Sequence, residues 1–215
     1  MIIGPKFKIA RRLGSRVFPK TQTSKFSLSS EMGRGGKKPG GRRPKALSEY
    51  GKQLLEKQKA RYTYLLKESQ FGSYVKKVRD HHQVGENPNV VLYQTLESRL
   101  DNVVFRLGLA PSRAAARQMV THGHIVVNNR RLNIPSHQMK INDRVAVRME
   151  SRSGGVGRMV TVEGGGGEEK VTRSVPTWLA YDEVGKEGKV LGRPLVGETE
   201  GEINFGAIME FYSRV

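Results

Sequence analysis

The stretch ESRLDNVVFRLGLAPSRAAARQMVTHGHIVVNNRRLNIPSHQMKINDRVAVR, from Glu97 to Arg148, decides the fold of this chain. Apolar residues occur at helical spacing at the beginning of this stretch and at the residue just before it: Leu96, Leu100, Val103 and Leu107. Because this spacing places them on one face, we predict a first short helix there, which Gly108 is suited to end.

A second short helix is predicted after Pro111, with Ser112 as its N-cap. Its successive alanines, residues 114–116, allow another backbone or a phosphate to come close. Arg113 and Arg117 stand four positions apart, so they share one face of this helix.

A β-hairpin is predicted next, after Gly123 ends the second helix. Apolar residues alternate in its two strands: Ile125 and Val127, then Leu132 and Ile134. Asn128-Asn129 is the two-residue turn, since asparagine tolerates the left-handed conformation that such a turn requires. One more strand follows, up to Arg148.

Polar and cationic side chains surround this small core. We take as candidate RNA-binding residues Ser98, Arg99, Arg106, Ser112, Arg113, Arg117, His122, His124, Asn128, Arg130 and Arg131. All but the capping Ser112 are expected to be exposed. Arginine suits a phosphate backbone because its guanidinium donates two hydrogen bonds to one phosphate. The alternative is a solvated basic helix, a common feature of protein surfaces.

The runs SRLDNVVFRLG and SRAAARQMVTHGHIVVN resemble the RNA-binding module named after ribosomal protein S-four. Pseudouridine synthases, an rRNA-methyltransferase-like family and some tyrosyl-tRNA synthetases carry that module too, so the rest of the chain must distinguish among them.

Composition indicates a polyanionic partner. The formal net charge is +18, and it is unevenly spread: residues 1–60 carry +13, residues 61–162 carry +9 and residues 163–215 carry −4.

The chain has no cysteine, which excludes disulfides, thiol catalysis and cysteine-based zinc sites. No apolar run approaches the roughly 20 residues that span a bilayer. We expect no signal peptide, a cytoplasmic location, and neither a metal nor a cofactor.

Residues 1–46 are predicted to form a basic, extended N-terminal arm. GRGGKKPGGRRPK, residues 33–45, alternates Gly and Pro with cations and can follow an rRNA backbone. Its candidate RNA-binding residues are Lys37, Lys38, Arg42, Arg43 and Lys45. The alternative is a flexible linker.

The start GPKFKIARR also resembles the bacterial S-four family, in which many members hold a zinc cluster with cysteines here. Because this chain has none, we expect no zinc and predict that packing of Phe7, Phe18 and Phe26 replaces the metal.

Residues 47–79 are predicted to be helical, and LSEYGKQLLEKQKARYTY resembles a helix of the same family. Lys52, Lys57, Lys59 and Arg61 are candidate RNA-binding residues there. Tyr62 and Tyr64 belong either to the core, which we favour, or to a base-stacking surface. Residues 80–89 are expected to be a polar loop.

We expect the acidic end of the chain to pack within the protein and to contact a neighbouring protein. Residues 164–170 are predicted to be a Gly-rich loop, and INFGAIMEFYSR, residues 203–214, a helix capped by Asn204. This helix and Val175, Trp178 and Leu179 are expected to pack on the helix of residues 47–66. We expect a neighbouring protein to contact Glu198, Glu200 and Glu202.

The resemblance extends over nearly the whole chain and implies an α+β fold: a mainly helical domain with an inserted RNA-binding module of two helices and a small antiparallel sheet. We assign residues 47–96 and 171–215 to the helical domain and residues 97–163 to the module.

For function, the resemblance implies a structural protein of the small ribosomal subunit, and not an enzyme. Such a protein binds the 5′ domain of small-subunit rRNA, nucleates assembly of the subunit body and contributes to translational accuracy. It would contact ribosomal protein S-five near the path by which mRNA enters. The alternatives are an RNA-modifying enzyme and a stand-alone RNA-binding module.

Overall fold

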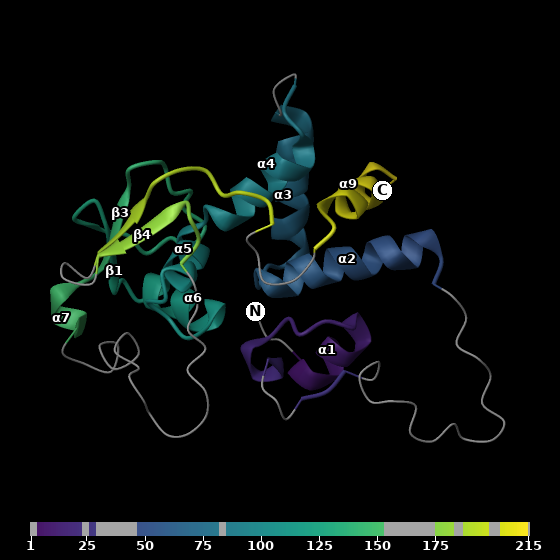
Figure 1. The fold of residues 1–215 in the computed structure, drawn as a ribbon, viewed down its shortest axis with the longest axis horizontal. Coiled ribbons are helices and arrows are strands. Elements are labelled where there is room, and N and C mark those ends of the chain that lie inside the picture. The colour runs from purple at the N-terminus through teal and green to yellow at the C-terminus, as the bar shows by residue number, and fades with distance from the viewer. Residues whose placement is uncertain are drawn as a thin grey trace. The chain divides into compact units, whose positions relative to one another are not determined.

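A computed structural model describes residues 4–22, 26–28, 47–81, 85–152, 175–182, 187–197 and 203–214. The chain divides into two compact units (Figure 1). Unit 1 comprises residues 1–92 and 199–215, and unit 2 comprises residues 93–198. Helices and one antiparallel sheet make the fold α+β, as predicted.

Unit 1 is helical. Its elements are α1 (Lys6–Leu13), the 3-10 turn η1 (Pro19–Thr21), α2 (Glu49–Thr63), α3 (Glu68–His81), the first half of α4 (Pro88–Glu97), and α9 (Phe205–Ser213). The predicted helical stretch of residues 47–79 is therefore two helices. The break lies at Leu65, whose φ of 54° is left-handed and cannot continue a helix.

The N-terminal residues are folded where the structure describes them, so the prediction of an extended arm is wrong for residues 4–22 and 26–28. Ala10, Phe18, Phe26 and Leu28 form a buried cluster, against which Tyr62 packs. The high charge of this segment obscured the short helix α1, whose apolar face points inward. The basic stretch of residues 33–45 lies outside the described residues.

The predicted aromatic packing at the N-terminus is confirmed for two of its three members. Phe18 and Phe26 are both 3% exposed, whereas Phe7 is half-exposed with its ring centroid 5.5 Å from that of Phe26. Tyr64 is buried too, which agrees with the core interpretation of that residue.

Helix α9 forms as predicted and packs on α2. The Asn204 side chain accepts a hydrogen bond from the Ala207 N–H at 3.0 Å and so caps the helix. Phe205, Ile208 and Phe211 are buried, and the Phe211 ring lies 5.4 Å from that of Tyr50 on α2.

Unit 2 combines a five-stranded antiparallel sheet of order β2-β1-β3-β5-β4 with α5 (Leu100–Arg106) and α6 (Arg113–Thr121), which lie against it (Figure 1). The strands are β1 (Ile125–Val127), β2 (Arg130–Arg131), β3 (Arg144–Val147), β4 (Leu179–Asp182) and β5 (Glu187–Val190), and the short helix α7 (Met149–Arg152) follows β3.

The hairpin turn is confirmed: Asn128 and Asn129 have φ of 49° and 63°, as a two-residue turn of this type requires. The return strand is shorter than predicted, because only Arg130 and Arg131 pair with β1. Ile134 is half-exposed beyond it.

The predicted first helix of this stretch is interrupted. Helix α4 ends at Glu97, Arg99 is extended, and α5 begins at Leu100. The interruption is held by backbone hydrogen bonds to a later loop: Leu100 N–H to the His137 carbonyl at 2.8 Å, and Met139 N–H to the Ser98 carbonyl at 2.8 Å. Such long-range pairing leaves no periodic signal in the sequence.

Strands β4 and β5 lie in the sheet of unit 2, whereas the predicted helical domain includes residues 171–215. Strand β5 pairs with β3, and β4 pairs with β5. Trp178, Leu179 and Val190 are buried in the core of unit 2, so the predicted packing of Trp178 and Leu179 on residues 47–66 is wrong. Gly188 of β5 is needed there, because a Cβ would run into the Leu107 side chain.

Candidate nucleic-acid interface

The exposed side of α6 is set by how that helix begins and what it buries. Its N-cap, Ser112, accepts a hydrogen bond from the Ala115 N–H at 3.2 Å, as predicted. Ala116, Met119 and Val120 face the core. The opposite side therefore remains at the surface, with the cations of α6 along it.

The two arginines of α6 are half-buried and oriented by α5. The Arg113 Nε–H donates to Asn102 Oδ1 at 2.8 Å, and its Cζ lies 4.3 Å from the centre of the Phe105 ring. Arg117 is 33% exposed in its side chain, and its Nη1 lies 4.0 Å from Asp101 Oδ2. Both guanidinium groups are thus brought to one helix face, one turn apart.

A second set of polar and cationic side chains lies where α6 meets the hairpin. The imidazole rings of His122 and His124 are 6.0 Å apart, and Arg131 Nη2 lies 3.4 Å from the His122 carbonyl oxygen, to which it donates. Gly123 has a φ of 73°, and a Cβ there would collide with the Arg131 guanidinium. The glycine therefore permits Arg131 to lie across the end of α6.

The surroundings of His124 disfavour its charged form. Burial is the main cause that lowers the pKa of His124, and the nearby charges of His122, Arg148 and Arg131 lower it further. Its Nδ1 lies 2.9 Å from Ser151 Oγ. At neutral pH this residue offers a hydrogen-bonding ring more than a charge.

The tip of the hairpin presents Arg130, which is exposed. Asn128 is exposed too, but its side chain holds the turn to β3: Nδ2 donates to Asp143 at 2.8 Å, and Oδ1 accepts from the Arg144 N–H at 2.9 Å. We interpret Asn128 as a residue of the turn.

The expectation that Arg99 and Arg106 are exposed is wrong. Arg99 is 1% exposed and donates to both oxygens of Asp101, at 3.0 and 2.7 Å. Arg106 is 7% exposed and donates to both oxygens of Glu97, each at 3.0 Å. Their carboxylate partners allow these cations to be buried, which charge and spacing alone did not indicate. Ser98 donates to Gln138 at 2.5 Å.

The candidate cations of α2 each have a carboxylate close by. Lys52 pairs with Glu49 at 2.7 Å, and Lys59 pairs with Glu56 at 2.5 Å. Lys57 and Arg61 share Glu68, at 2.7 and 3.6 Å. Lys57 also lies 4.4 Å from the Phe211 ring centre, and its side chain is only 9% exposed, so it belongs to the packing of α2 with α9.

Lys37, Lys38, Arg42, Arg43 and Lys45 lie outside the described residues, as do the proposed protein contacts Glu198, Glu200 and Glu202.

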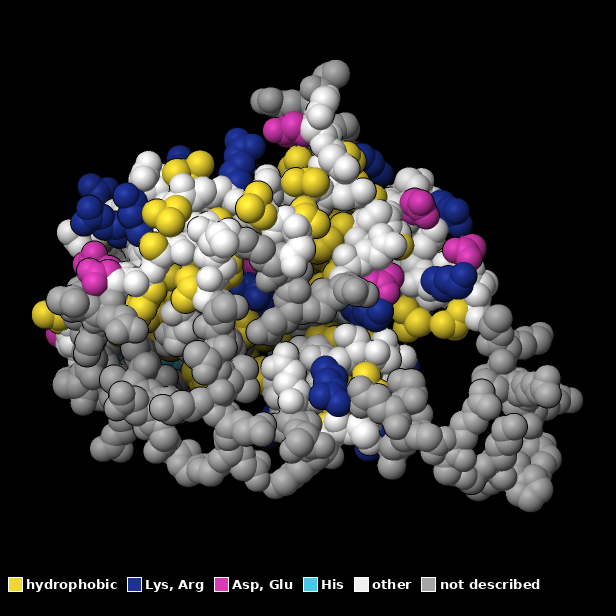
Figure 2. Space-filling model, viewed as in Figure 1, with side chains coloured by type: hydrophobic (Ala, Val, Ile, Leu, Met, Phe, Trp, Pro, Cys, Tyr) yellow, Lys and Arg dark blue, Asp and Glu magenta, His cyan; other side chains and the backbone are white. Residues whose placement is uncertain are grey.

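The cations of the folded N-terminal segment are not among the residues that the sequence patterns indicate. These side chains are exposed: Lys6, Lys8, Arg11, Arg12, Arg16 and Lys20. No acidic residue precedes Glu31 in the sequence, so this segment has a strongly positive surface. In unit 2, Lys140 and Arg144 are exposed as well. Figure 2 shows Lys and Arg side chains over the sheet end of unit 2 and over the segment that carries α1.

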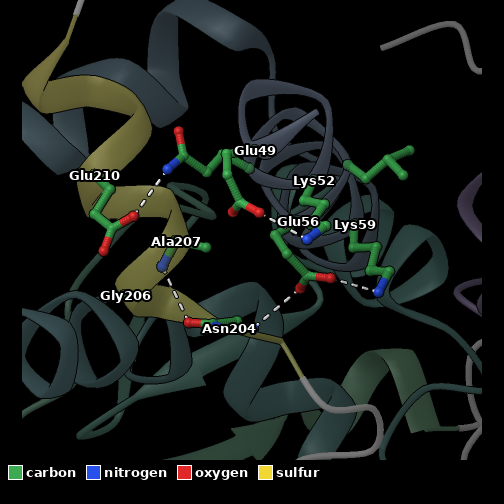
Figure 3. A pocket seen from close by; sticks show the side chains of 10 residues that line it. Glu49, Lys52, Glu56, Lys59, Asn204, Gly206, Ala207 and Glu210 are labelled. Atoms are coloured by element: carbon green, nitrogen blue, oxygen red, sulfur yellow. Dashed lines mark hydrogen bonds and ion pairs between the residues drawn. The ribbon is translucent and has the colours of Figure 1, made fainter. Parts of the chain in front are cut away.

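Unit 1 also has a polar pocket of about 460 Å³ between α2 and α9 (Figure 3). Its charged groups are engaged with neighbours. Glu49 and Glu56 pair with lysines one turn on, and Glu210 accepts from the Gln53 amide at 2.8 Å. The hydrogen bond from Lys52 lowers the pKa of Glu49. A general acid or base needs a pKa close to the working pH, and the lowered pKa of Glu49 lies further from neutrality than its ordinary value.

Within the part of the chain that the structure describes, no cluster of three or more His, Cys, Asp or Glu side chains could hold a metal ion. None of the described helices is long and apolar enough to cross a membrane.

Two family models match the chain, and they divide it near the end of α4. The model described as the S4 domain matches residues 98–145, and the model described as the ribosomal protein S4/S9 N-terminal domain matches residues 1–97.

Relatives match over the full length. A small ribosomal subunit protein uS4 from Roseiflexus castenholzii is 42% identical over 212 residues, which cover 99% of this chain and 98% of the relative. The protein of the same name from Endomicrobium trichonymphae is 37% identical over 215 residues, with 99% and 98% covered.

Proposed function

Because this chain belongs to the ribosomal protein S4 family, we propose that it is a structural protein of the small ribosomal subunit that binds rRNA directly. One observation carries the proposal: Arg113 and Arg117 lie on one face of α6, inside a module that matches the S4 domain. Two guanidinium groups one helical turn apart suit successive phosphates of an RNA backbone.

We place the rRNA contact on three groups of side chains. The first is the α6 face with Arg113 and Arg117. The second is the end of α6 and the neighbouring hairpin, with His122, Arg130 and Arg131. The third is the cationic segment around α1, whose exposed lysines and arginines have no acidic residue near them in the sequence. Arg99, Arg106 and Lys57 are left out because they are buried in ion pairs.

An RNA-modifying enzyme is the less favoured alternative. Enzymes that use such a module for docking need a catalytic domain beside it. Here the N-terminal part, residues 1–97, instead matches the N-terminal domain of ribosomal S4/S9 proteins. The same match argues against a stand-alone RNA-binding module.

The finer roles rest on family resemblance. We propose that the protein binds the 5′ domain of the rRNA early and nucleates assembly of the subunit body. We further propose that it contacts ribosomal protein S-five near the path by which mRNA enters, with Glu198, Glu200 and Glu202 at the protein contact, and that it supports decoding accuracy. Its place would then be the ribosome in the cytoplasm.

The test is binding to a transcript of small-subunit rRNA across a salt series. If roughly six to ten phosphates are neutralised, affinity should fall about a thousandfold or more between about 50 and 200 mM salt. The double variant Arg113→Ala, Arg117→Ala should bind much more weakly than Lys76→Ala, Lys77→Ala, which removes the same charge from the exposed side of α3. Equal losses, or a flat salt response, would count against this surface.

A further inference from the structure

Resting on the proposed rRNA contact of α6, we propose that Asn102 is a positioning residue for Arg113. Asn102 is buried and is not itself expected to touch RNA. It fixes the orientation of the Arg113 guanidinium before RNA arrives, through a chain of buried hydrogen bonds that begins at Glu97.

The chain of contacts is continuous. Arg106 donates to both oxygens of Glu97, and Asn102 Nδ2 donates to Glu97 Oε2 at 2.7 Å and to the Glu97 carbonyl at 3.0 Å. Asn102 Oδ1 in turn accepts from the Arg113 Nε–H at 2.8 Å. Glu97 and Asn102 are 0% and 2% exposed, so the chain is shielded from water up to Arg113.

The chemistry of its neighbours allows only one orientation of the Asn102 amide. A carboxylate can only accept, so the amide nitrogen must face Glu97; a guanidinium can only donate, so the amide oxygen must face Arg113. If the amide were flipped, its oxygen would face the carboxylate of Glu97, which can only accept, and its nitrogen would face the guanidinium of Arg113, which can only donate. Glu97 therefore determines where the acceptor for Arg113 lies.

Two further contacts restrict Arg113. The Phe105 ring lies beneath its guanidinium, with 4.3 Å from Cζ to the ring centre, and Phe105 is itself buried. Ser112 fixes the start of α6, and hence the backbone of Arg113, by capping that helix. The bond to Asn102 uses only one of the guanidinium's several N–H donors, and it uses Nε rather than the terminal nitrogens.

Pre-orientation has a measurable consequence. A long side chain that is already ordered loses less entropy on binding, so removing the anchor should weaken binding even though the charge of Arg113 remains. We expect Asn102→Ala to lower rRNA affinity about two- to tenfold. The slope of affinity against salt should stay unchanged, whereas Arg113→Ala should reduce it by roughly 0.7 to 0.9.

The experiment is a double-mutant cycle with the full-length protein and a small-subunit rRNA transcript. If Asn102 acts through Arg113, the variant with both Asn102→Ala and Arg113→Ala binds as Arg113→Ala does alone. If the role of Asn102 is purely structural, Asn102→Ala would weaken binding whether or not Arg113 is present. The fold-losses in affinity of Asn102→Ala and Arg113→Ala would then multiply in the double variant. Asn133→Ala, the same change at an exposed position of the module, is the matched control and should not alter affinity.

The outcomes separate this inference from the proposed function. Multiplying losses, an unaffected affinity in Asn102→Ala, or an unaffected affinity in Arg113→Ala would overturn the inference while rRNA binding stands. A wild-type protein that does not bind the transcript would overturn the proposed function itself. If Asn102→Ala does not fold, the hydrogen-exchange rate of the Arg113 Nε–H in the wild-type protein tests whether that group is held by Asn102. We expect slow exchange, and a rate as fast as that of exposed Arg130 would overturn the inference.

Discussion

Replacing Ile208 by alanine tests the packing of α9 on α2. Ile208 is wholly buried, at 0% exposed, between the buried Phe205 and Phe211 on the same helix face. Truncating a buried isoleucine to alanine costs about 2–5 kcal/mol through lost apolar burial and the cavity left behind. We expect the higher part of this range, because large aromatic side chains on either side limit how far the site can collapse.

The assay is urea unfolding followed by far-UV circular dichroism, which reports mainly the helices. The midpoint should fall without a change in the slope against urea. Trp178 is the only tryptophan and lies in the core of unit 2, so its fluorescence follows the other unit. Ser213→Ala is the matched control: it is exposed on the same helix, and we expect a change within about 0.5 kcal/mol.

Under conditions where the variant remains folded, its rRNA affinity should equal that of the wild type, because the proposed RNA-binding surface does not include α9. A cost below about 1 kcal/mol would refute the burial argument. A large loss of affinity with unchanged stability would show instead that α9 binds RNA.

Three more predictions follow from particular contacts. Glu97→Gln should lower the free energy of unfolding by about 3–5 kcal/mol, since it leaves Arg106 buried without a countercharge; Glu150→Gln, at an exposed carboxylate, should cost less than 1 kcal/mol in the same denaturant titration. Burial alone would raise the pKa of Glu68, but hydrogen bonds from Lys57 and Tyr212 and the charges of Lys57 and Arg61 outweigh it and lower that pKa below its ordinary 4.5. The stabilisation by Glu68 is thus present above about pH 4.5 and lost as pH falls below it, so thermal midpoints of Glu68→Gln should decline less steeply on acidification than those of the wild type. Finally, Lys8→Ala with Arg12→Ala, on the exposed side of α1, should weaken rRNA binding at unchanged thermal midpoint, and an affinity equal to that of Lys76→Ala, Lys77→Ala would remove α1 from the proposed surface.

Local patterns predicted much of this fold. The Ser112 and Asn204 caps, the Asn128-Asn129 turn and the buried face of α9 all follow from residues within a few positions of one another, and the structure contains each of them. Strands β4 and β5 did not follow from such patterns. Both are short, and their place in the sheet depends on the pairing of β5 with β3, far away in the sequence, and of β4 with β5.

The residues of the candidate interface could be predicted from the sequence only where a cationic side chain is also exposed. Helical spacing correctly placed Arg113 and Arg117 on one face of α6. It could not separate them from Arg99 and Arg106, because burial of an arginine depends on a carboxylate partner at the right position in space. The exposed cations of α1 were not singled out for the opposite reason: their segment is predicted to be an extended arm, so it has no helix face on which to place them.

The most direct test of the central claim is where the protein sediments in its own cells. Ribosomes would be dissociated at low magnesium, separated on a gradient in salt that removes loosely bound protein, and probed for this chain. We predict that it migrates with the small subunit in about equal amount to the rRNA there, and that the Arg113→Ala, Arg117→Ala variant is depleted from that fraction. Recovery of the wild-type protein at the top of the gradient, or with the large subunit, would contradict it.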